Sequence, residues 1–173
     1  MSRSGAVTFK GNPMSLAGNA VGVGQQAPDF KLHNFDKGAL VAVTPADLKG
    51  KPTFISVVPS LDTPVCQIQT KRFNEQLAAL GNRVNAITVS LDLPFAMNRF
   101  CGAEHIANMR AWSDYQDRSF GQNWGMLIEE LKILARGVFV LDKDGKVVYA
   151  EQVKEVAQEP NYDAAIKALN SAV

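Results

Sequence analysis

Residues 53–66 read Thr-Phe-Ile-Ser-Val-Val-Pro-Ser-Leu-Asp-Thr-Pro-Val-Cys, and this stretch decides how the rest of the chain is interpreted. Its first part, Thr53–Val58, is a continuous apolar and β-branched run, which is typical of a strand buried on both faces. Its second part offers Thr63 as a helix cap and Pro64 for the first helical turn. The stretch therefore predicts a buried strand followed by a helix, with Cys66 in the first turn.

A thiol in the first turn of a helix is a candidate nucleophile. The exposed backbone N–H groups and the helix dipole there favour the thiolate over the thiol. The only other cysteine is Cys101, so the Cys-x-x-Cys pair of a thioredoxin is absent. Two distant cysteines in a reducing compartment are either free core residues or a working redox pair. Inert packing is the alternative reading of Cys66, because free cysteines are among the most buried residues.

Composition excludes several classes of protein. A chain of 173 residues with 46% hydrophobic and 20% charged residues suits one domain with a substantial core, residues 1–173. A net charge of +1 gives no reason to expect a nucleic acid or membrane partner. The N-terminus lacks the apolar middle of a secretory signal, so a cytoplasmic location is expected. His33 and His105 lie outside any ligand-spaced cluster, so we predict loop or surface positions for both and neither a metal nor an organic cofactor.

The helix predicted to follow the strand runs from residue 64 to residue 80. Asp62 or Thr63 can cap it and Gly81 can end it. Gln69 interrupts its inward side, which consists of Val65, Cys66, Ile68, Phe73, Leu77 and Leu80.

The remaining chain alternates strand-like and helix-like segments. Hairpins are predicted at the N-terminus, around Gly11-Asn12-Pro13, and late in the chain, around Lys143-Asp144-Gly145. Extended segments are predicted from Pro28, at 40–44, 84–90 and 106–112, and helical segments at 46–50, 95–100 and 162–169; 119–124 is ambiguous. This order predicts an α/β, thioredoxin-like fold, with a mixed central sheet flanked by helices and an N-terminal β-hairpin extension.

These residues resemble the peroxiredoxin family. Pro59, Thr63 and Cys66 match its Pro-x-x-x-Thr-x-x-Cys motif. The longer run Pro-Ser-Leu-Asp-Thr-Pro-Val-Cys, continued by Lys-Arg-Phe-Asn at 71–74, is similar to the bacterial thiol peroxidase branch, an atypical two-cysteine group. Further likeness lies at 100–104, 134–142 and 159–165.

The resemblance implies a role for each matching residue. Cys66 would be the peroxidatic cysteine and Cys101 the resolving cysteine of the same subunit. Thr63 and Arg136 would orient the peroxide and stabilise the thiolate, while Pro59 shields it. The resemblance also implies reduction of hydrogen peroxide and alkyl hydroperoxides, recycling by thioredoxin, and a homodimer.

From the residues alone, other interpretations stay open. Thr63 can be a plain helix cap, Pro59 a strand end, and Arg136 half of a structural ion pair. A general thiol–disulfide oxidoreductase and a non-catalytic redox-sensing module are the rival functions. If the protein forms a disulfide, we expect oxidation to remodel Phe95–Glu104. His105 stands where the family pattern has a small residue or glycine.

Overall fold

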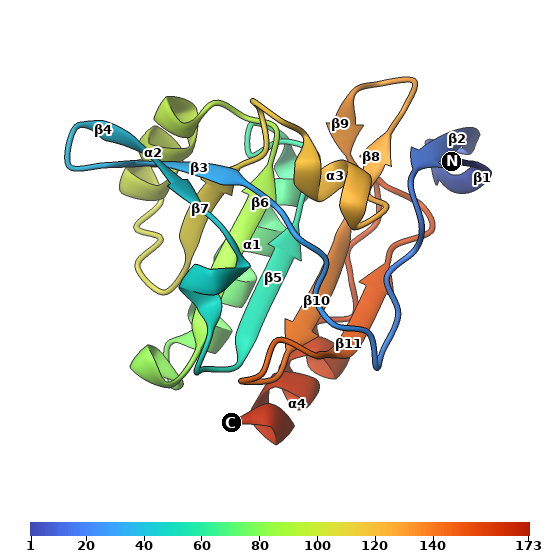
Figure 1. Ribbon diagram of the computed structural model, residues 1–173. Helices are drawn as coiled ribbons and strands as arrows, with labels where there is room; N and C mark the ends of the chain where they lie inside the picture. Colours follow the sequence, from blue (N-terminus) through green and yellow to red (C-terminus); the bar gives the residue numbers. More distant parts are fainter.

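The computed structural model describes all 173 residues and contains two β-sheets, the larger of which has helices packed against it (Figure 1). In spatial order, the larger sheet consists of β11 (Val147–Gln152), β10 (Gly137–Leu141), β5 (Thr53–Val57), β6 (Asn85–Ser90), β7 (Arg110–Ser113), β3 (Leu32–Asp36) and β4 (Ala39–Val43). The pairs β5–β6 and β6–β7 are parallel and all others are antiparallel. The predicted thioredoxin-like mixed sheet is therefore confirmed.

The smaller sheet contains the N-terminal hairpin. Its order is β1 (Ser2–Phe9), β2 (Asn12–Ala17), β8 (Leu127–Ile128) and β9 (Ile133–Leu134). The hairpin was predicted, but its turn lies one residue earlier than expected, at Lys10 and Gly11, whose φ angles are +51° and +82°. Two positive φ angles suit a tight hairpin turn, so Asn12 and the following proline belong to β2.

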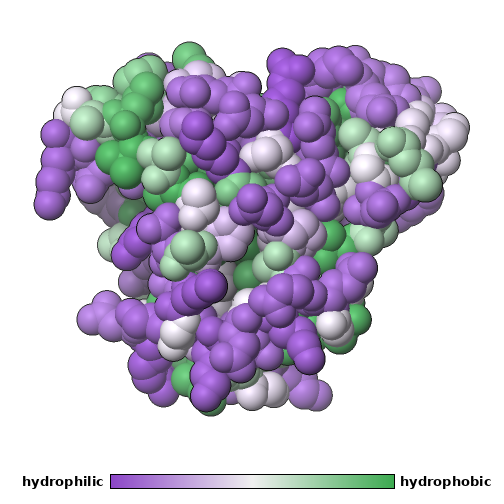
Figure 2. Space-filling model, in the orientation of Figure 1, coloured by the Kyte–Doolittle hydropathy of each residue, from purple (hydrophilic) through white to green (hydrophobic).

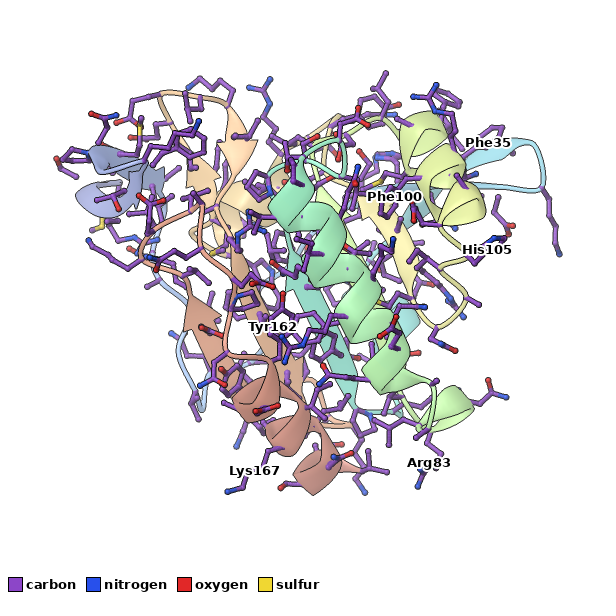
Figure 3. All side chains as sticks on the ribbon, turned by 180° about the vertical axis from the view of Figure 1, so that it is seen from behind. Phe35, Arg83, Phe100, His105, Tyr162 and Lys167 are labelled. Atoms are coloured by element: carbon purple, nitrogen blue, oxygen red, sulfur yellow. The ribbon has the colours of Figure 1, made fainter.

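Helices cover the larger sheet. They are α1 (Pro64–Leu77), α2 (Pro94–Ala103), α3 (Ser119–Asn123) and α4 (Tyr162–Ala172), with short 3-10 turns η1 (Pro45–Leu48) and η2 (Gly81–Arg83). Figure 3 shows α1 and α4 in front of the sheet on the same face. Their apolar sides share one buried cluster with β5 and β10, in which Phe73 of α1 and Leu169 of α4 meet Phe54 and Val138. None of the helices is long and apolar enough to cross a bilayer.

Helix α1 ends earlier than predicted, and its inward side differs from the prediction at Ile68. The helix ends at Leu77, and Gly81 begins η2 instead. Ile68, expected to point inward, is 50% exposed, whereas Gln69 is fully buried. Hydrophobicity alone does not predict which of these two side chains is buried, because the Gln69 side chain has polar partners inside the protein, described below.

Other boundaries also shift. Helix α2 begins at Pro94 and runs to Ala103, so it is longer than the predicted 95–100, and Cys101 lies near its end, as predicted. Strand β7 is confined to 110–113, and β3 begins at Leu32 rather than at Pro28. The ambiguous segment after Arg118 forms the short helix α3.

His33 is not the surface residue that was predicted. It lies in β3 between β4 and β7, is only 6% exposed, and meets the ring of Tyr115 edge-on. The residue type alone did not indicate this burial, because β3 has neighbouring strands on both sides.

Candidate active site

The junction of β5 and α1 forms the predicted strand-to-helix turn. The strand ends at Val57, residues 58–63 form the connection, and α1 opens on Pro64, whose missing N–H suits a first helical position. Cys66 lies in the first turn of α1 and has no solvent-accessible surface. Its thiol is therefore held inside the protein, close to the positive end of the helix dipole.

Arg136 lies directly before β10 and reaches Cys66. It is 2% exposed, and its Nη2 donates to Cys66 Sγ at 3.5 Å. Its Nε donates to the Val156 carbonyl at 2.8 Å and its Nη1 to Gln69 Oε1 at 2.9 Å. The only ion pairs of the protein are Lys31–Asp117 and Lys71–Glu104. The structural ion pair considered for Arg136 is therefore absent.

Gln69 is a site residue that sequence reasoning missed. Its Oε1 accepts from Arg136, while its Nε2 donates to Ser56 Oγ at 2.8 Å. Since an amide is fixed by partners on both of its ends, Gln69 restricts how the guanidinium can turn. The signal was present in the sequence as a glutamine interrupting the inward side of the helix, one turn after Cys66.

Thr63 occupies the cap position of α1 without capping it through its side chain. Its φ and ψ of −114° and 148° are those of a cap residue, but no helical N–H reaches its hydroxyl. The hydroxyl instead donates to the Ser60 carbonyl at 2.8 Å. No hydrogen bond joins Thr63 to Cys66, and Thr63 is exposed. Thr63 therefore stands at the cap position of α1, but the side-chain cap predicted for it is wrong.

Pro59 is buried at the start of this loop. Together with Ser60 it lines an open cavity of about 330 Å³, whose other walls are Leu91, Asp92, Tyr115, Arg118, Lys132 and Ile133. Pro59 thus forms part of the wall of this cavity, two residues after the end of β5.

Cys101 approaches the same region from α2. It is half-buried and packs against the small apolar cluster that contains Val58, Leu61, Cys66, Met97 and Ala111. Both cysteines are free thiols. Burial raises the pKa of the Cys101 thiol, because a low-dielectric surrounding disfavours the thiolate. No group of three or more His, Cys, Asp or Glu side chains is placed to bind a metal ion.

The end of α2 carries an unfavourable backbone conformation. The N–H of Ile106 donates to the Cys101 carbonyl at 2.9 Å and that of His105 to the Gly102 carbonyl at 3.5 Å, which is a Schellman cap. In this cap His105 adopts a φ of +55°, the left-handed region that glycine enters most easily. The left-handed conformation at residue 105 therefore explains why the family pattern has a small residue or glycine where this chain has His105.

Replacing His105 with glycine is expected to stabilise the end of α2. The gain should be about 1 kcal/mol, the order of the penalty for a side chain in the left-handed region. Amide exchange at Ile106, whose N–H closes the cap on Cys101, should slow about fivefold, and chemical denaturation should show the increased stability. Lys10→Gly is the matched control, because Lys10 has a φ of +51° in the distant hairpin turn. Unchanged exchange at Ile106 in His105→Gly would contradict this prediction.

Comparison with known proteins identifies the family of the chain. The Redoxin family matches residues 22–166. The thiol peroxidase of Bacillus subtilis (strain 168) is 52% identical over 167 residues, covering 96% of this chain and 98% of that protein. That of Streptococcus pneumoniae (strain ATCC BAA-255 / R6) is 51% identical, covering 94% and 97%.

Solved structures lead to the same family. The crystal structure of a peroxiredoxin-like protein from Aquifex aeolicus superposes with a TM-score of 0.89 at 40% identity, covering 99% of this chain and 98% of that one. The thiol peroxidase from Chromobacterium violaceum has a TM-score of 0.83 and covers 95% of each chain, but at 19% identity it supports the fold alone. The chain belongs to the redoxin family and, within it, to the peroxiredoxin-type thiol peroxidases of bacteria.

Proposed function

We propose that this thiol peroxidase reduces hydrogen peroxide and alkyl hydroperoxides through Cys66. The Cys66 thiolate attacks one oxygen of the O–O bond, and that bond breaks as the S–O bond forms. The second oxygen leaves with the bonding electrons as hydroxide or alkoxide and takes up a proton. The sulfur is oxidised to a sulfenic acid, while the peroxide is reduced to water or an alcohol.

The observation that carries this proposal is the uncompensated charge of Arg136. A buried guanidinium without a carboxylate partner is costly unless another anion lies close. Its hydrogen-bond acceptors are the Val156 carbonyl, the Gln69 amide and the Cys66 sulfur. Ionised sulfur would supply the missing negative charge, and the N-terminus of α1 would add to the attraction. Arg136 would then also donate to the peroxide oxygens in the transition state.

Thr63 and Pro59 have supporting roles in the proposed reaction. The Thr63 hydroxyl now donates to the Ser60 carbonyl, and a small rotation would let it exchange this partner for a peroxide oxygen. Since Cys66 is covered by protein, the peroxide has to enter through a movement of the exposed residues at this loop. Buried Pro59 would limit the access of water to the thiolate.

Cys101 is the proposed resolving thiol. It attacks the Cys66 sulfenic acid, water leaves, and an intrachain disulfide forms. The raised pKa of Cys101 keeps it protonated while α2 is folded, which protects it from direct oxidation. A disulfide also needs Cα atoms within about 7 Å. We therefore propose that the end of α2 unwinds, remodelling Phe95–Glu104 and exposing Cys101 as it becomes reactive.

A dithiol protein of the thioredoxin type is the proposed reductant. It would reopen the disulfide by exchange through a mixed disulfide, which requires a reducing compartment such as the cytoplasm.

A homodimer is proposed as well, with the apolar surface over β4 and α2 as the contact with a second copy (Figure 2). Leu40, Val41, Leu93 and Phe95 are each between 42% and 51% exposed there. Sedimentation over a range of protein concentrations would measure the association.

The Cys101→Ser variant tests the proposed cycle. With thioredoxin, its reductase and NADPH, the unchanged protein should consume many equivalents of peroxide. Cys101→Ser should oxidise once at an unchanged rate and then stall, because no intrachain disulfide can form. Mass spectrometry with a sulfenic-acid reagent should find the label on Cys66. Turnover by Cys101→Ser at the rate of the unchanged protein would show that the resolving step is wrong.

A further inference from the structure

The carboxylate of Asp92 connects the loop that carries Thr63 to the ends of the central strands. Asp92 follows β6, and its Oδ1 accepts from Ser60 Oγ at 2.7 Å. Its Oδ2 accepts from the backbone N–H of Leu61 and from Ser90 Oγ, each at 2.7 Å. The Asp92 carboxylate therefore accepts three hydrogen bonds, two of them from the loop before α1.

The sheet fixes Asp92 from the other side. The N–H of Asp92 donates to Ser90 Oγ at 3.1 Å, and its carbonyl accepts from Ser113 Oγ at 2.5 Å. Ser90 and Ser113 are the last residues of β6 and β7. The ends of two buried parallel strands therefore hold the Asp92 backbone in place, while its carboxylate contacts the loop.

Hydrogen bonds continue from Asp92 to the first turn of α1. The Ser60 carbonyl accepts from both the hydroxyl and the N–H of Thr63, at 2.8 and 3.2 Å. The Thr63 carbonyl then accepts from the Gln67 N–H at 3.0 Å. The neighbouring Leu61, whose N–H is bound by Asp92, packs in the same apolar cluster as Cys66. A change at Asp92 would therefore reach both Thr63 and Cys66.

We propose that Asp92 is a positioning residue for the peroxidase reaction, which sets the loop at 59–63 and so aligns Thr63 and Cys66 for attack on the peroxide. This inference rests on the proposed role of Cys66 but not on that of Cys101 or thioredoxin.

The experiment measures the first oxidation of Cys66 after rapid mixing with peroxide, in the Cys101→Ser background. Asp92→Ala should slow this step about tenfold or more, because small misplacements of reacting groups have large effects on rate. Asp92→Asn should recover most of the rate, since its oxygen can accept from Leu61 while its NH₂ group donates to a serine hydroxyl. A role in overall stability alone would not give this recovery. Asp117→Ala removes the same charge from the exposed loop after β7 and should leave the rate unchanged.

A second variant keeps the proposal testable if alanine at position 92 prevents folding. Ser60→Ala removes one donor without touching the carboxylate, and the loss of one such bond should slow Cys66 oxidation about fivefold. Oxidation at the parental rate in Asp92→Ala, or in Ser60→Ala where Asp92→Ala does not fold, would overturn the positioning role. If the parent Cys101→Ser protein itself fails to react, the proposed function fails instead.

Discussion

Cys66→Ser is expected to reduce peroxide consumption to the uncatalysed background. A serine hydroxyl is almost entirely un-ionised near neutral pH, so it cannot replace a thiolate as the attacking group. The substitution also replaces the sulfur that Arg136 contacts at 3.5 Å with a neutral hydroxyl, which cannot balance the charge of the guanidinium. Stopped-flow measurement of peroxide loss checks the first effect, and thermal unfolding shows whether the fold is kept.

Cys101→Ser serves as the control for this loss of activity. It makes the same change of sulfur to oxygen in a residue of the same apolar cluster. Only Cys66→Ser should lose the first oxidation, because Cys101 is proposed to act after the sulfenic acid has formed. If peroxide oxidised Cys66→Ser stoichiometrically at the parental rate, Cys66 would not be the residue that attacks the peroxide.

Arg136→Lys has the second largest expected effect, about a hundredfold loss in the rate of Cys66 oxidation. A lysine keeps the charge, but its compact ammonium group cannot contact Val156, Gln69 and the sulfur in the fixed fork of a guanidinium. Loss of one oriented donor to a developing negative charge typically costs a factor of about 10²–10³. Rapid-mixing kinetics across a range of pH, with the ultraviolet absorbance of the thiolate, would measure the change.

Arg72→Lys is a matched control on α1. Arg72 is exposed and lies over the Tyr162 ring at 4.0 Å, away from the sulfur. Its replacement exchanges the guanidinium over the ring for an ammonium group and leaves the Arg136–Cys66 contact intact, so peroxidase activity should stay near that of the unchanged protein. Equal rates for Arg136→Lys and the unchanged protein would contradict the role proposed for Arg136.

Local patterns explain why much of the fold could be predicted. The run at 53–58 specifies a buried strand by its own composition, and Lys143-Asp144-Gly145 specifies a hairpin within a few residues. Asn161 also caps α4 as its residue type predicts, with its side chain accepting from the Ala164 N–H. Strands β8 and β9 have two residues each, which is too short for any alternation to appear.

The polar partners of the site depend on contacts that sequence spacing does not contain. Arg136 is separated from Cys66 by 70 positions, and only the pairing of β10 with β5 brings them together. The resemblance to peroxiredoxins pointed to Arg136, whereas the residues around it in the sequence favoured a structural ion pair. Ile68 was assigned to the wrong side, and the role of Gln69 on the inward side was missed, because an apolar scale does not register an amide with two buried partners.

His105, whose left-handed conformation closes α2, would affect how long the proposed Cys66 sulfenic acid persists. A sulfenic acid waiting for its partner thiol can meet a second peroxide molecule and become a sulfinic acid, which most cells cannot repair. By weakening the cap that holds the Cys101 carbonyl, His105 would shorten this waiting time. Resistance to over-oxidation in this protein would then be set partly by a backbone angle nearly forty positions away from the sulfur at risk.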